Sequence, residues 1–409
     1  MGFPFDPVGA GLVYNVLDYG ADPTGTNDST TALQAALNAV AATGGTLFTP
    51  RGTYLSNGLT LTLGGKRIAW VGAGQGAKIK CTATTASDST GGIYVTGGGA
   101  IAADWISIRD LEFEGNSTCG YGVALYDCYQ GELANLYVHD FTTGGGWGIG
   151  IVLNESIDCI VYNPVVSNCA YSNLSIGNSA NANTIIGGWL VNAPSGSFGA
   201  RVNSNGNIFV GTIVQNCDGG IEFGGATANR FTGWLEGNPT YQIYDSGTDN
   251  WVSGYSVPSG TGESPFYYTG ATRPRLDRVV FYATSAPVIN IETGTTGLVI
   301  SDCSGIAAAD ITNSSGNPFV VRNCTPLNPA GSTVPGTAFA LPASGTAWTN
   351  NTGVDGTLYV TGAGVVTDVV VQGVTVASSL SVGQSYFIPA GGTITFTYTT
   401  APTLVFVGD

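Results

Sequence analysis

Short apolar segments recur through the middle of the chain at intervals of 21 to 28 residues. Each segment is followed by a turn of variable length, as expected for β-strands that belong to a repeating unit. The segments begin at Trp105, Gly131, Cys159, Thr184, Ile208, Arg230, Trp251, Arg275, Leu298 and Phe319. Such repeats bury their apolar faces by stacking on one another. The pattern predicts an all-β fold, a right-handed single-stranded parallel β-helix.

Polar residues and glycines fall into columns when the repeats are aligned. We interpret two asparagine columns as structural ladders rather than glycan contacts, because asparagine side chains can hydrogen-bond between coils ~4.8 Å apart. A glycine column marks a tight place in the coil. The first asparagine column is Asn168, Asn192, Asn216 and Asn238, and the second is Asn183, Asn207, Asn229 and Asn250. The glycine column is Gly187, Gly211, Gly233 and Gly254.

The two ends of the repeat region have a different character. Residues 30–42 predict a helix that begins at Asp28 or Ser29, ends at Gly44-Gly45, and closes the open end of the β-helix. Its apolar stripe is Leu33, Ala36, Leu37 and Val40. After Pro329 a linker, PAGSTVPG, leads into short strands that predict a β-sandwich-like domain. The predicted domains are an N-terminal cap (1–45), the β-helix (46–330) and the C-terminal domain (331–409).

The net charge of the chain limits the classes of molecule that it is expected to bind. Only 10% of the residues are charged, and 27 acidic against 12 basic residues give a net charge of −15. Nucleic acid and anionic membranes are therefore not expected as partners, because both require clustered Lys and Arg. The opening residues lack the pattern of a signal peptide. The main basic group is interpreted as a solvated face: Lys66, Arg67, Lys78 and Lys80.

The eight cysteines do not have the spacing of a zinc site, and no disulfide scaffold is expected in a chain of this length. Two pairs occupy matching positions of different repeats, Cys169 with Cys217 and Cys303 with Cys324. We interpret both pairs as buried thiols rather than disulfides.

One strand, IRDLEFEGN, carries three acidic residues at alternate positions. Asp110, Glu112 and Glu114 are expected to face outward, with Leu111 and Phe113 inward. Glycoside hydrolysis needs two carboxylates that flank the scissile bond, and residues two apart on a strand lie ~6.8 Å apart at Cα. That spacing falls within the ~6.5–9.5 Å range of inverting enzymes. The alternative is an ordinary polar face that blocks edge pairing.

The next repeat, NLYVHD, extends this candidate site. Aligning the two strands places Asn135 beside Asp110, Tyr137 beside Glu112, and His139 beside Glu114. His139 is the single histidine of the chain. The predicted catalytic residues are Asp110, Glu112, Glu114 and His139, with Tyr137 as a sugar-binding residue.

A second candidate cluster lies further along the chain. Glu222 in GGIEFGG and Glu236 in GWLEGN are its acids, and Trp234 and Tyr241 could stack on sugar rings. The alternative is again an ordinary outward face. No metal site or cofactor is predicted; calcium is possible but no residue pattern indicates it.

Residues 14–58 resemble the opening of pectate-lyase-superfamily β-helix proteins, notably phage tailspikes and related depolymerases. The resemblance rests on DYGADPTG, the alanine-rich helix, Gly44-Gly45 and the PRGTY turn. The segment IPAGGTITFTYTTAPTLVFVGD also looks like a trimer-forming module of phage spikes. The resemblance implies a homotrimer in a virion tail or outside cells, in contact with other tail proteins and acting on polysaccharide.

Three functions are consistent with these observations. The first is a tailspike-like glycoside hydrolase that binds and cuts bacterial surface polysaccharide. A lyase is less favoured, because neither Arg109 nor Arg201 has the dense aspartate cluster that calcium-dependent pectate lyases use. The others are a non-catalytic glycan-binding adhesin and a structural fibre. A site between subunits of a trimer would leave no recognisable pattern in the sequence of one chain.

Overall fold

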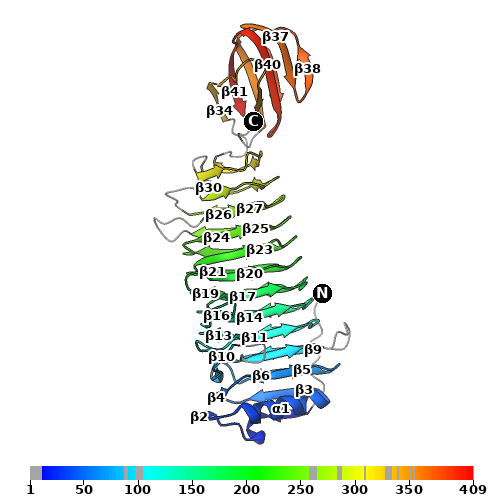
Figure 1. The fold of residues 1–409 in the computed structure, drawn as a ribbon, viewed down its shortest axis with the longest axis vertical. Helices are drawn as coiled ribbons and strands as arrows, with labels where there is room; N and C mark the ends of the chain where they lie inside the picture. The colour runs from blue at the N-terminus through cyan, green and yellow to red at the C-terminus, as the bar shows by residue number, and fades with distance from the viewer. Residues whose placement is uncertain are drawn as a thin grey trace. The chain divides into compact units, whose positions relative to one another are not determined.

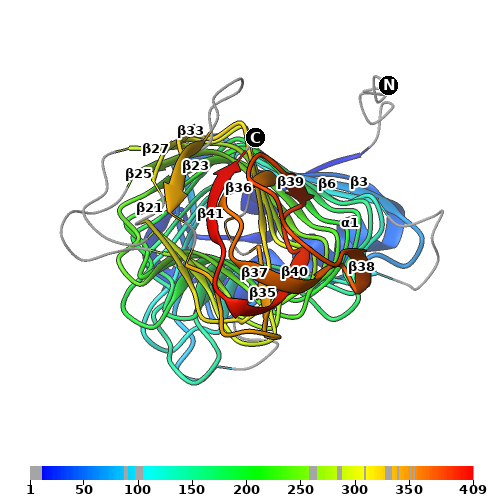
Figure 2. The same cartoon turned by 90° about the horizontal axis from the view of Figure 1, so that it is seen from above.

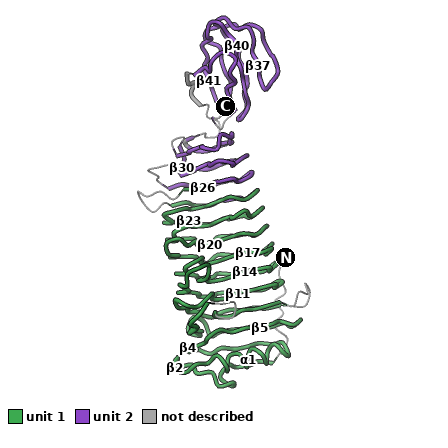
Figure 3. Tube along the Cα trace, in the orientation of Figure 1, with its two compact units in different colours: residues 1–250, 254–267 green, residues 251–253, 268–409 purple. Residues whose placement is uncertain are grey.

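A computed structural model describes residues 12–86, 91–97, 105–257, 265–282, 288–307, 310–327, 334–338, 340–350, 352 and 355–408. The opening segment, in which no signal peptide is expected, and the predicted 330/331 domain boundary lie outside these residues. The chain divides into two compact units (Figure 3). Unit 1 is Met1–Asn250 with Gly254–Tyr267, and unit 2 is Trp251–Ser253 with Tyr268–Asp409. The predicted domain limits stay a prediction.

Unit 1 consists of stacked coils, most of which contribute two short strands to sheet A and one to sheet B (Figure 1). The first arm of sheet A contains β9 (Trp105–Arg109), β12 (Glu132–Ala134), β15 (Ile160–Tyr162) and β18 (Thr184–Ile186). The second arm contains β10 (Glu112–Glu114), β13 (Tyr137–His139), β16 (Val165–Ser167) and β19 (Trp189–Val191). Two longer strands run through both arms, β21 (Ile208–Gln215) and β23 (Arg230–Glu236).

Sheet B contains the strand that follows the second arm in these coils. Its strands in unit 1 include β5 (Thr60–Thr62), β8 (Ile93–Thr96), β11 (Tyr121–Tyr126), β14 (Ile149–Asn154), β17 (Ser172–Gly177), β20 (Phe198–Val202), β22 (Gly219–Phe223) and β24 (Tyr241–Asp245). Neighbouring strands pair in parallel, for example β11 with β14 and β14 with β17. Seen end-on, the coils lie over one another (Figure 2). The predicted parallel β-helix is therefore confirmed, and the hand of its coil stays a prediction.

A sharp corner separates the two arms of sheet A. The corner residue has a positive φ in successive coils: 58° at Asp110, 51° at Asn135, 48° at Asn163, 61° at Gly187 and 70° at Gly211. Aspartate, asparagine and glycine tolerate this left-handed conformation best. The predicted glycine column therefore continues this corner. Gly233 differs, because its φ is not positive, but a Cβ there would clash with the Thr212 carbonyl oxygen.

A second corner follows the second arm. Its residues show that one member of the first predicted asparagine column was misplaced. Asp140, Asn168, Asn192, Asn216 and Gly237 have φ values between 53° and 64°. Asn238, which the alignment placed in this column, is one position further on. It is fully buried, and its Oδ1 accepts a hydrogen bond from the Cys217 backbone N–H at 2.9 Å. The alignment was wrong there because glycine takes over the left-handed corner in that coil.

The other asparagine column is a buried ladder, as predicted. Asn183 donates through Nδ2 to Asn207 Oδ1 at 3.0 Å, and Asn207 donates to Asn229 Oδ1 at 3.1 Å. Asn229 continues the series to Asn250 at 3.2 Å. Backbone N–H groups of Asn183, Asn207 and Asn229 donate to the same acceptors. The ladder ends at Asp245, whose Oδ1 accepts from Asn250 Nδ2 at 2.9 Å.

Asp245→Asn is expected to stabilise the protein at neutral pH. Burial raises the pKa of Asp245 to about 6, although hydrogen bonds from Gly247 and Asn250 oppose the shift. In the unfolded chain the pKa of an aspartate is about 4. A higher pKa in the folded protein contributes stability that is fully present below pH 4 and is lost as the pH rises through about 6. The amide keeps an acceptor without the charge, so the gain at pH 7 should be roughly 1–3 kcal/mol.

Urea denaturation of both proteins between pH 4 and pH 8 measures this effect. The stability difference should grow as the pH rises and level off above the pKa of Asp245. A difference that does not depend on pH would contradict the assignment.

The N-terminal helix α1 (Thr30–Thr43) covers one end of unit 1 (Figure 1). Its predicted apolar stripe, Leu33, Ala36, Leu37 and Val40, is fully buried. Asp28 Oδ1 accepts from the Thr30 N–H at 3.0 Å, and the helix ends at Gly44, whose N–H donates to the Val40 carbonyl. The earlier strands of sheet A are β1 (Val13–Asn15), β2 (Thr24–Asp28), β3 (Gly45–Thr49), β4 (Gly52–Ser56), β6 (Arg67–Gly72) and β7 (Ala77–Cys81). The helix contacts β5 of sheet B and β1, β3 and β4 of sheet A. Within the described residues, no helix has the length and apolar character to span a membrane.

Unit 2 contains further parallel strands and then two antiparallel sheets. The parallel strands include β27 (Arg275–Phe281), β28 (Ile289–Ile291), β29 (Val299–Ser301), β30 (Ser304–Ile306), β31 (Ile311–Asn313) and β32 (Val320–Arg322). One four-stranded sheet has the order β34 (Val334–Ala338), β41 (Thr403–Gly408), β36 (Gly356–Gly362), β39 (Ser385–Ile388). The other has the order β35 (Ala347–Thr349), β40 (Thr393–Thr400), β37 (Val365–Val371), β38 (Val374–Ala377). Residues of both sheets share one core, which is compatible with the predicted sandwich.

Candidate functional site

The outward face of the second arm of sheet A carries the main predicted site residues. Their strands pair in register, so their side chains form two adjacent columns. The aromatic column is Glu112, Tyr137, Val165, Trp189, Ile213 and Trp234. The neighbouring polar column is Glu114, His139, Ser167, Val191, Gln215 and Glu236. The predicted register of Tyr137 beside Glu112 and His139 beside Glu114 is confirmed.

Two lysines on β7 complete a charged cluster at one end of these columns. β7 pairs with β10, so that Lys78 lies beside Glu112 and Lys80 beside Glu114. Lys78 Nζ lies 2.7 Å from Glu112 Oε1 and 2.6 Å from Glu114 Oε2. Lys80 Nζ lies 2.6 Å from Glu114 Oε1. Both lysines lie partly exposed on an early coil, in line with the interpretation as a solvated face, but the sequence did not indicate their ion pairs, because the turn between the coils brings their strand beside the acidic strand.

His139 links the cluster to the second corner. Its Nε2 lies 3.1 Å from Glu112 Oε1, and its Nδ1 lies 2.8 Å from Asp140 Oδ2. The ring of Tyr137 stacks on the imidazole with 4.3 Å between centroids. Glu112 and His139 are each only 8% exposed. Both ring nitrogens can donate to these carboxylates only when the imidazole carries two protons.

Asp140 was not among the predicted site residues. Its Oδ1 accepts from Asn168 Nδ2 at 2.6 Å, so the corner ladder orients the carboxylate that holds His139. The signal for it was its position directly after the histidine in the VHD sequence. Single-strand alternation could not place it, because its φ of 64° turns the chain there.

The lysines keep one glutamate of the cluster ionised. Burial raises the pKa of Glu114, but the hydrogen bonds and charges of Lys78 and Lys80 outweigh it and hold that pKa below its usual value. Burial likewise lowers the pKa of Lys78, and the two glutamates outweigh it and raise that pKa. Glu114 is thus suited to act as a base or nucleophile, and not as a proton donor.

The carboxylates lie closer together than the sequence suggested. One oxygen of each glutamate and one nitrogen of His139 all lie within 4.8 Å of one another. Inverting glycosidases need ~6.5–9.5 Å between the carboxyl groups, whereas retaining enzymes have ~5–5.5 Å. One oxygen of each glutamate thus lies closer to the other than the Cα spacing suggested, because Lys78 Nζ lies 2.7 Å from Glu112 Oε1 and 2.6 Å from Glu114 Oε2; the inverting spacing stays a prediction.

These donors do not fit calcium. The ion takes six to eight oxygen ligands. Among the described residues, Glu112, Glu114 and His139 form the one group of donors close enough to hold an ion, and Lys78 already places its positive charge beside both carboxylates.

Asp110 is not part of the charged cluster. Its φ of 58° places it at the corner between the arms, where it interrupts the alternation that was expected to align it with Glu112. Its Oδ1 accepts from Asn135 Nδ2 at 3.0 Å, and Arg109 Nη1 lies 3.6 Å from its Oδ2. The predicted neighbour Asn135 is therefore correct, but the shared face with Glu112 and Glu114 is not.

The structure divides the second predicted cluster between two sheets. Glu236 and Trp234 lie in β23 on the same outward face as Glu112, and Trp234 Nε1 donates to Glu236 Oε2 at 3.0 Å. Trp234 also stacks on Tyr255 with 5.1 Å between ring centroids. Glu222 and Tyr241 lie in β22 and β24 of sheet B. The prediction that these residues form a single cluster was wrong, because the chain turns between sheet A and sheet B within each coil.

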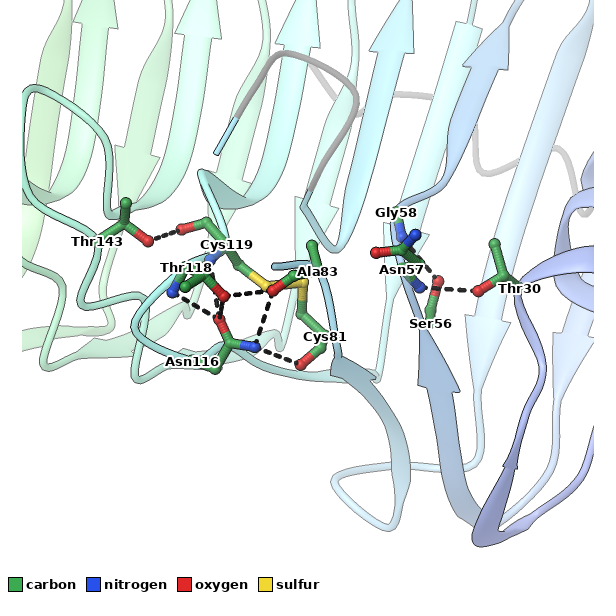
Figure 4. The surroundings of a disulfide bond; sticks show 10 residues. All are labelled: Thr30, Ser56, Asn57, Gly58, Cys81, Ala83, Asn116, Thr118, Cys119 and Thr143. Carbon is green, nitrogen blue, oxygen red and sulfur yellow. Dashed lines mark hydrogen bonds between the residues drawn. A yellow bond between two sulfur atoms is a disulfide. The ribbon is translucent and has the colours of Figure 1, made fainter. Parts of the chain in front are cut away.

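A disulfide that the sequence did not predict, Cys81–Cys119, lies next to the strands of the charged cluster (Figure 4). Cys81 ends β7, and Cys119 lies in the turn after β10, so the bond joins the strands that carry the lysines and the glutamates. Beside it, Asn116 Nδ2 donates to the carbonyl oxygens of Cys81 and Ala83, each at 3.2 Å (Figure 4). The other cysteines are buried free thiols, as expected for the two matched pairs.

The sequence matches a family model over more than half of its length. Residues 13–232 match the family described as rhamnogalacturonase A/epimerase, pectate lyase-like. No curated protein sequence matches the chain significantly.

Several solved structures share the fold at low identity. ORF18 of Geobacillus virus E2 is 17% identical, with a TM-score of 0.51 over 96% of this chain and 75% of that one. The Streptococcus pneumoniae surface protein and adhesin PfbA is 13% identical, with a TM-score of 0.52 over 76% and 97%. The DFA-IIIase of Arthrobacter chlorophenolicus A6, in complex with GF2, is 11% identical, with a TM-score of 0.56 over 76% and 93%. These similarities show the fold alone, and the family match shows that the chain belongs to the rhamnogalacturonase A/epimerase, pectate lyase-like family.

Proposed function

We propose that this chain binds a polysaccharide on the second arm of sheet A and hydrolyses it at the charged cluster. The main support for polysaccharide binding is the aromatic column. Tyr137, Trp189 and Trp234 occupy every second coil, and since coils are ~4.8 Å apart their rings recur about every 9.6 Å. Trp189 is 53% exposed, and planar rings of this kind stack on the apolar faces of sugars. A glycan that runs along the column reaches the cluster at Tyr137.

The cluster contains groups for both halves of the reaction. In the proposed mechanism the Glu112–His139 pair gives its proton to the leaving glycosidic oxygen as the C–O bond breaks. Glu114, held ionised by two lysines, attacks the anomeric carbon. Water then releases the sugar and returns a proton to the pair. Because Glu114 itself attacks the anomeric carbon, this mechanism retains the configuration.

A non-catalytic adhesin is the second candidate. It is favoured by the ion pairs themselves, because Lys78 and Lys80 already satisfy the carboxylates that catalysis would use. The similar surface adhesin of Streptococcus pneumoniae has the same fold. In this case the aromatic column would hold the glycan without cleaving it.

We also propose that the protein acts in a virion tail or elsewhere outside cells, as a homotrimer in contact with other tail proteins. The similarity to ORF18 of Geobacillus virus E2 supports a viral setting. The two antiparallel sheets after residue 333 support the resemblance to a trimer-forming module. Sedimentation of the full chain measures the oligomeric state.

Trp189→Ala is expected to weaken polysaccharide binding about tenfold, the loss of roughly one stacking contact. The melting temperature should not change, because the indole lies on the outer face. Equilibrium binding to capsular and lipopolysaccharide chains measures the effect.

Tyr162→Ala is the matched control, since this ring is 49% exposed but lies on the first arm. Equal binding by wild type and Trp189→Ala would contradict the proposed path. The absence of binding to every glycan would favour a structural fibre.

A further inference from the structure

The outer face of sheet B carries a second surface that the proposed function does not use. In the register of β20, β22 and β24, Arg201 lies beside Glu222, and Glu222 beside Tyr244. In the adjacent column Phe198, Gly219 and Tyr241 follow one another. Gly219 is buried, and the side chains of the other residues in these two columns are partly exposed.

Arg201 is held in one position by contacts on several sides. Its guanidinium carbon lies 4.4 Å from the ring centroid of Tyr171 and 4.5 Å from that of Phe198. Its Nε donates to the Tyr171 carbonyl at 3.3 Å, and its Nη1 donates to Glu222 Oε2 at 2.5 Å. An arginine confined in this way fixes the position of the carboxylate and balances its charge.

Glu222 keeps hydrogen-bonding capacity after this pairing. Arg201 occupies Oε2, whereas Oε1 has no hydrogen-bond partner among the residues that the structure describes. The hydroxyl groups of Tyr241 and Tyr244 also lack a partner within that part of the chain. Three polar groups that can accept or donate hydrogen bonds are therefore available beside an ion pair whose net charge is zero.

Four aromatic rings surround these polar groups. Phe198 and Tyr241 are parallel, with an interplanar angle of 5° and 6.3 Å between centroids. Gly219 lies between them in the column, and a Cβ at that position would lie 2.5 Å from the Phe198 ring. Tyr244 stacks on Tyr267 at 5.6 Å, and Tyr241 lies 5.3 Å from Tyr244. The four rings form one cluster, here called the platform, in which Tyr241 is inclined by 64° to Tyr244 and by 53° to Tyr267.

We propose that this platform, made of Phe198, Glu222, Tyr241, Tyr244 and Tyr267, is a second carbohydrate site that binds neutral sugars. Aromatic faces match the C–H faces of a sugar ring, and the free oxygens match its hydroxyl groups. The sugar is neutral because Arg201 already balances Glu222. The next outward residue beside Arg201 is Ser175, and this polar residue separates the platform from the apolar cluster of Tyr121, Ala124 and Val152 on the same sheet.

Calorimetry with neutral cello-, malto-, xylo- and manno-hexaose, and with acidic oligogalacturonate, tests this site in the full chain. Trp189→Ala provides the background, because it weakens the path on sheet A. In that background at least one neutral hexaose should bind, and adding Tyr244→Ala should weaken its binding at least tenfold. Tyr244→Phe retains the ring and should lose only a few-fold, and Glu222→Gln should fall between the two.

Tyr162→Ala, added to the same background, is the matched tyrosine control and should leave binding unchanged. If Tyr244→Ala lowers the melting temperature, the comparison of Tyr244→Phe with Glu222→Gln decides the outcome. The proposal is overturned if no neutral hexaose binds, if only the acidic one binds, or if the Tyr244 and Glu222 variants bind like the background protein. Failure of the path on sheet A would appear separately, as normal binding by Trp189→Ala alone.

Discussion

Glu114→Gln is expected to reduce the rate of polysaccharide cleavage by at least about 100-fold, the usual effect of losing a catalytic carboxylate. The amide keeps the size of the side chain but cannot attack an anomeric carbon or activate water. Glu112→Gln should cause a similar loss, because the amide cannot share a proton with His139 at 3.1 Å. The release of reducing ends and the size of the products measure the rate.

Glu132→Gln is the matched control for these variants. Glu132 lies on the first arm of the same sheet, where its Oε2 accepts from Ser107 Oγ at 2.7 Å, outside the charged cluster. Its cleavage rate should equal that of wild type. Equal shortening of the polysaccharide by wild type, Glu112→Gln and Glu114→Gln would show that the cluster is not the catalytic site. Glycan binding without any shortening by wild type would favour the adhesin.

Asn207→Ala is expected to lower the free energy of unfolding by about 3–5 kcal/mol. The side chain is fully buried in the asparagine ladder, and its Oδ1 accepts from the Asn183 N–H and Nδ2. Truncation leaves the Asn183 N–H and one of the two Nδ2 hydrogens without an acceptor, while Nδ2 still donates to the Ser156 carbonyl at 2.9 Å. Each buried donor without an acceptor costs about 1–3 kcal/mol. It also removes the hydrogen bond to Asn229 Oδ1. Chemical denaturation measures the change.

Asn192→Gly is the control for this experiment. Asn192 is exposed at the second corner with a φ of 55°, a conformation that glycine adopts without strain. The free energy of unfolding of the Asn192→Gly variant should stay within about 0.5 kcal/mol of the wild-type value. A loss at Asn207 no larger than at Asn192 would mean that the ladder does not stabilise the stack of coils.

The sequence predicted the fold well because the repeating coil has a local origin. Recurring apolar segments, the alanine-rich helix and the Asn183–Asn250 column each correspond to an observed element. The register of Glu112 with Tyr137 was also accessible, because matching apolar residues on two short strands permit one alignment without exposing a buried face.

The misplaced residues lie where the chain turns. A positive φ at Asp110 breaks the period of two, so counting along the strand put this residue on the wrong face. The pairing of Lys78 with Glu112 spans turns of irregular length, and so does the Cys81–Cys119 disulfide. No periodicity within one segment contains that information.

The sequence by itself determined the stacked parallel coils, the helix at one end, the buried ladder, and the pair Glu114 and His139 in register. Those features depend on periodicity and on which side chains can be buried. The tertiary structure alone decided that two lysines neutralise the acidic strand, that Asp140 holds His139, and that Glu222 and Glu236 lie on different sheets. These outcomes depend on how far each turn carries the chain before the next strand begins, and variable turns leave no regular pattern in the sequence.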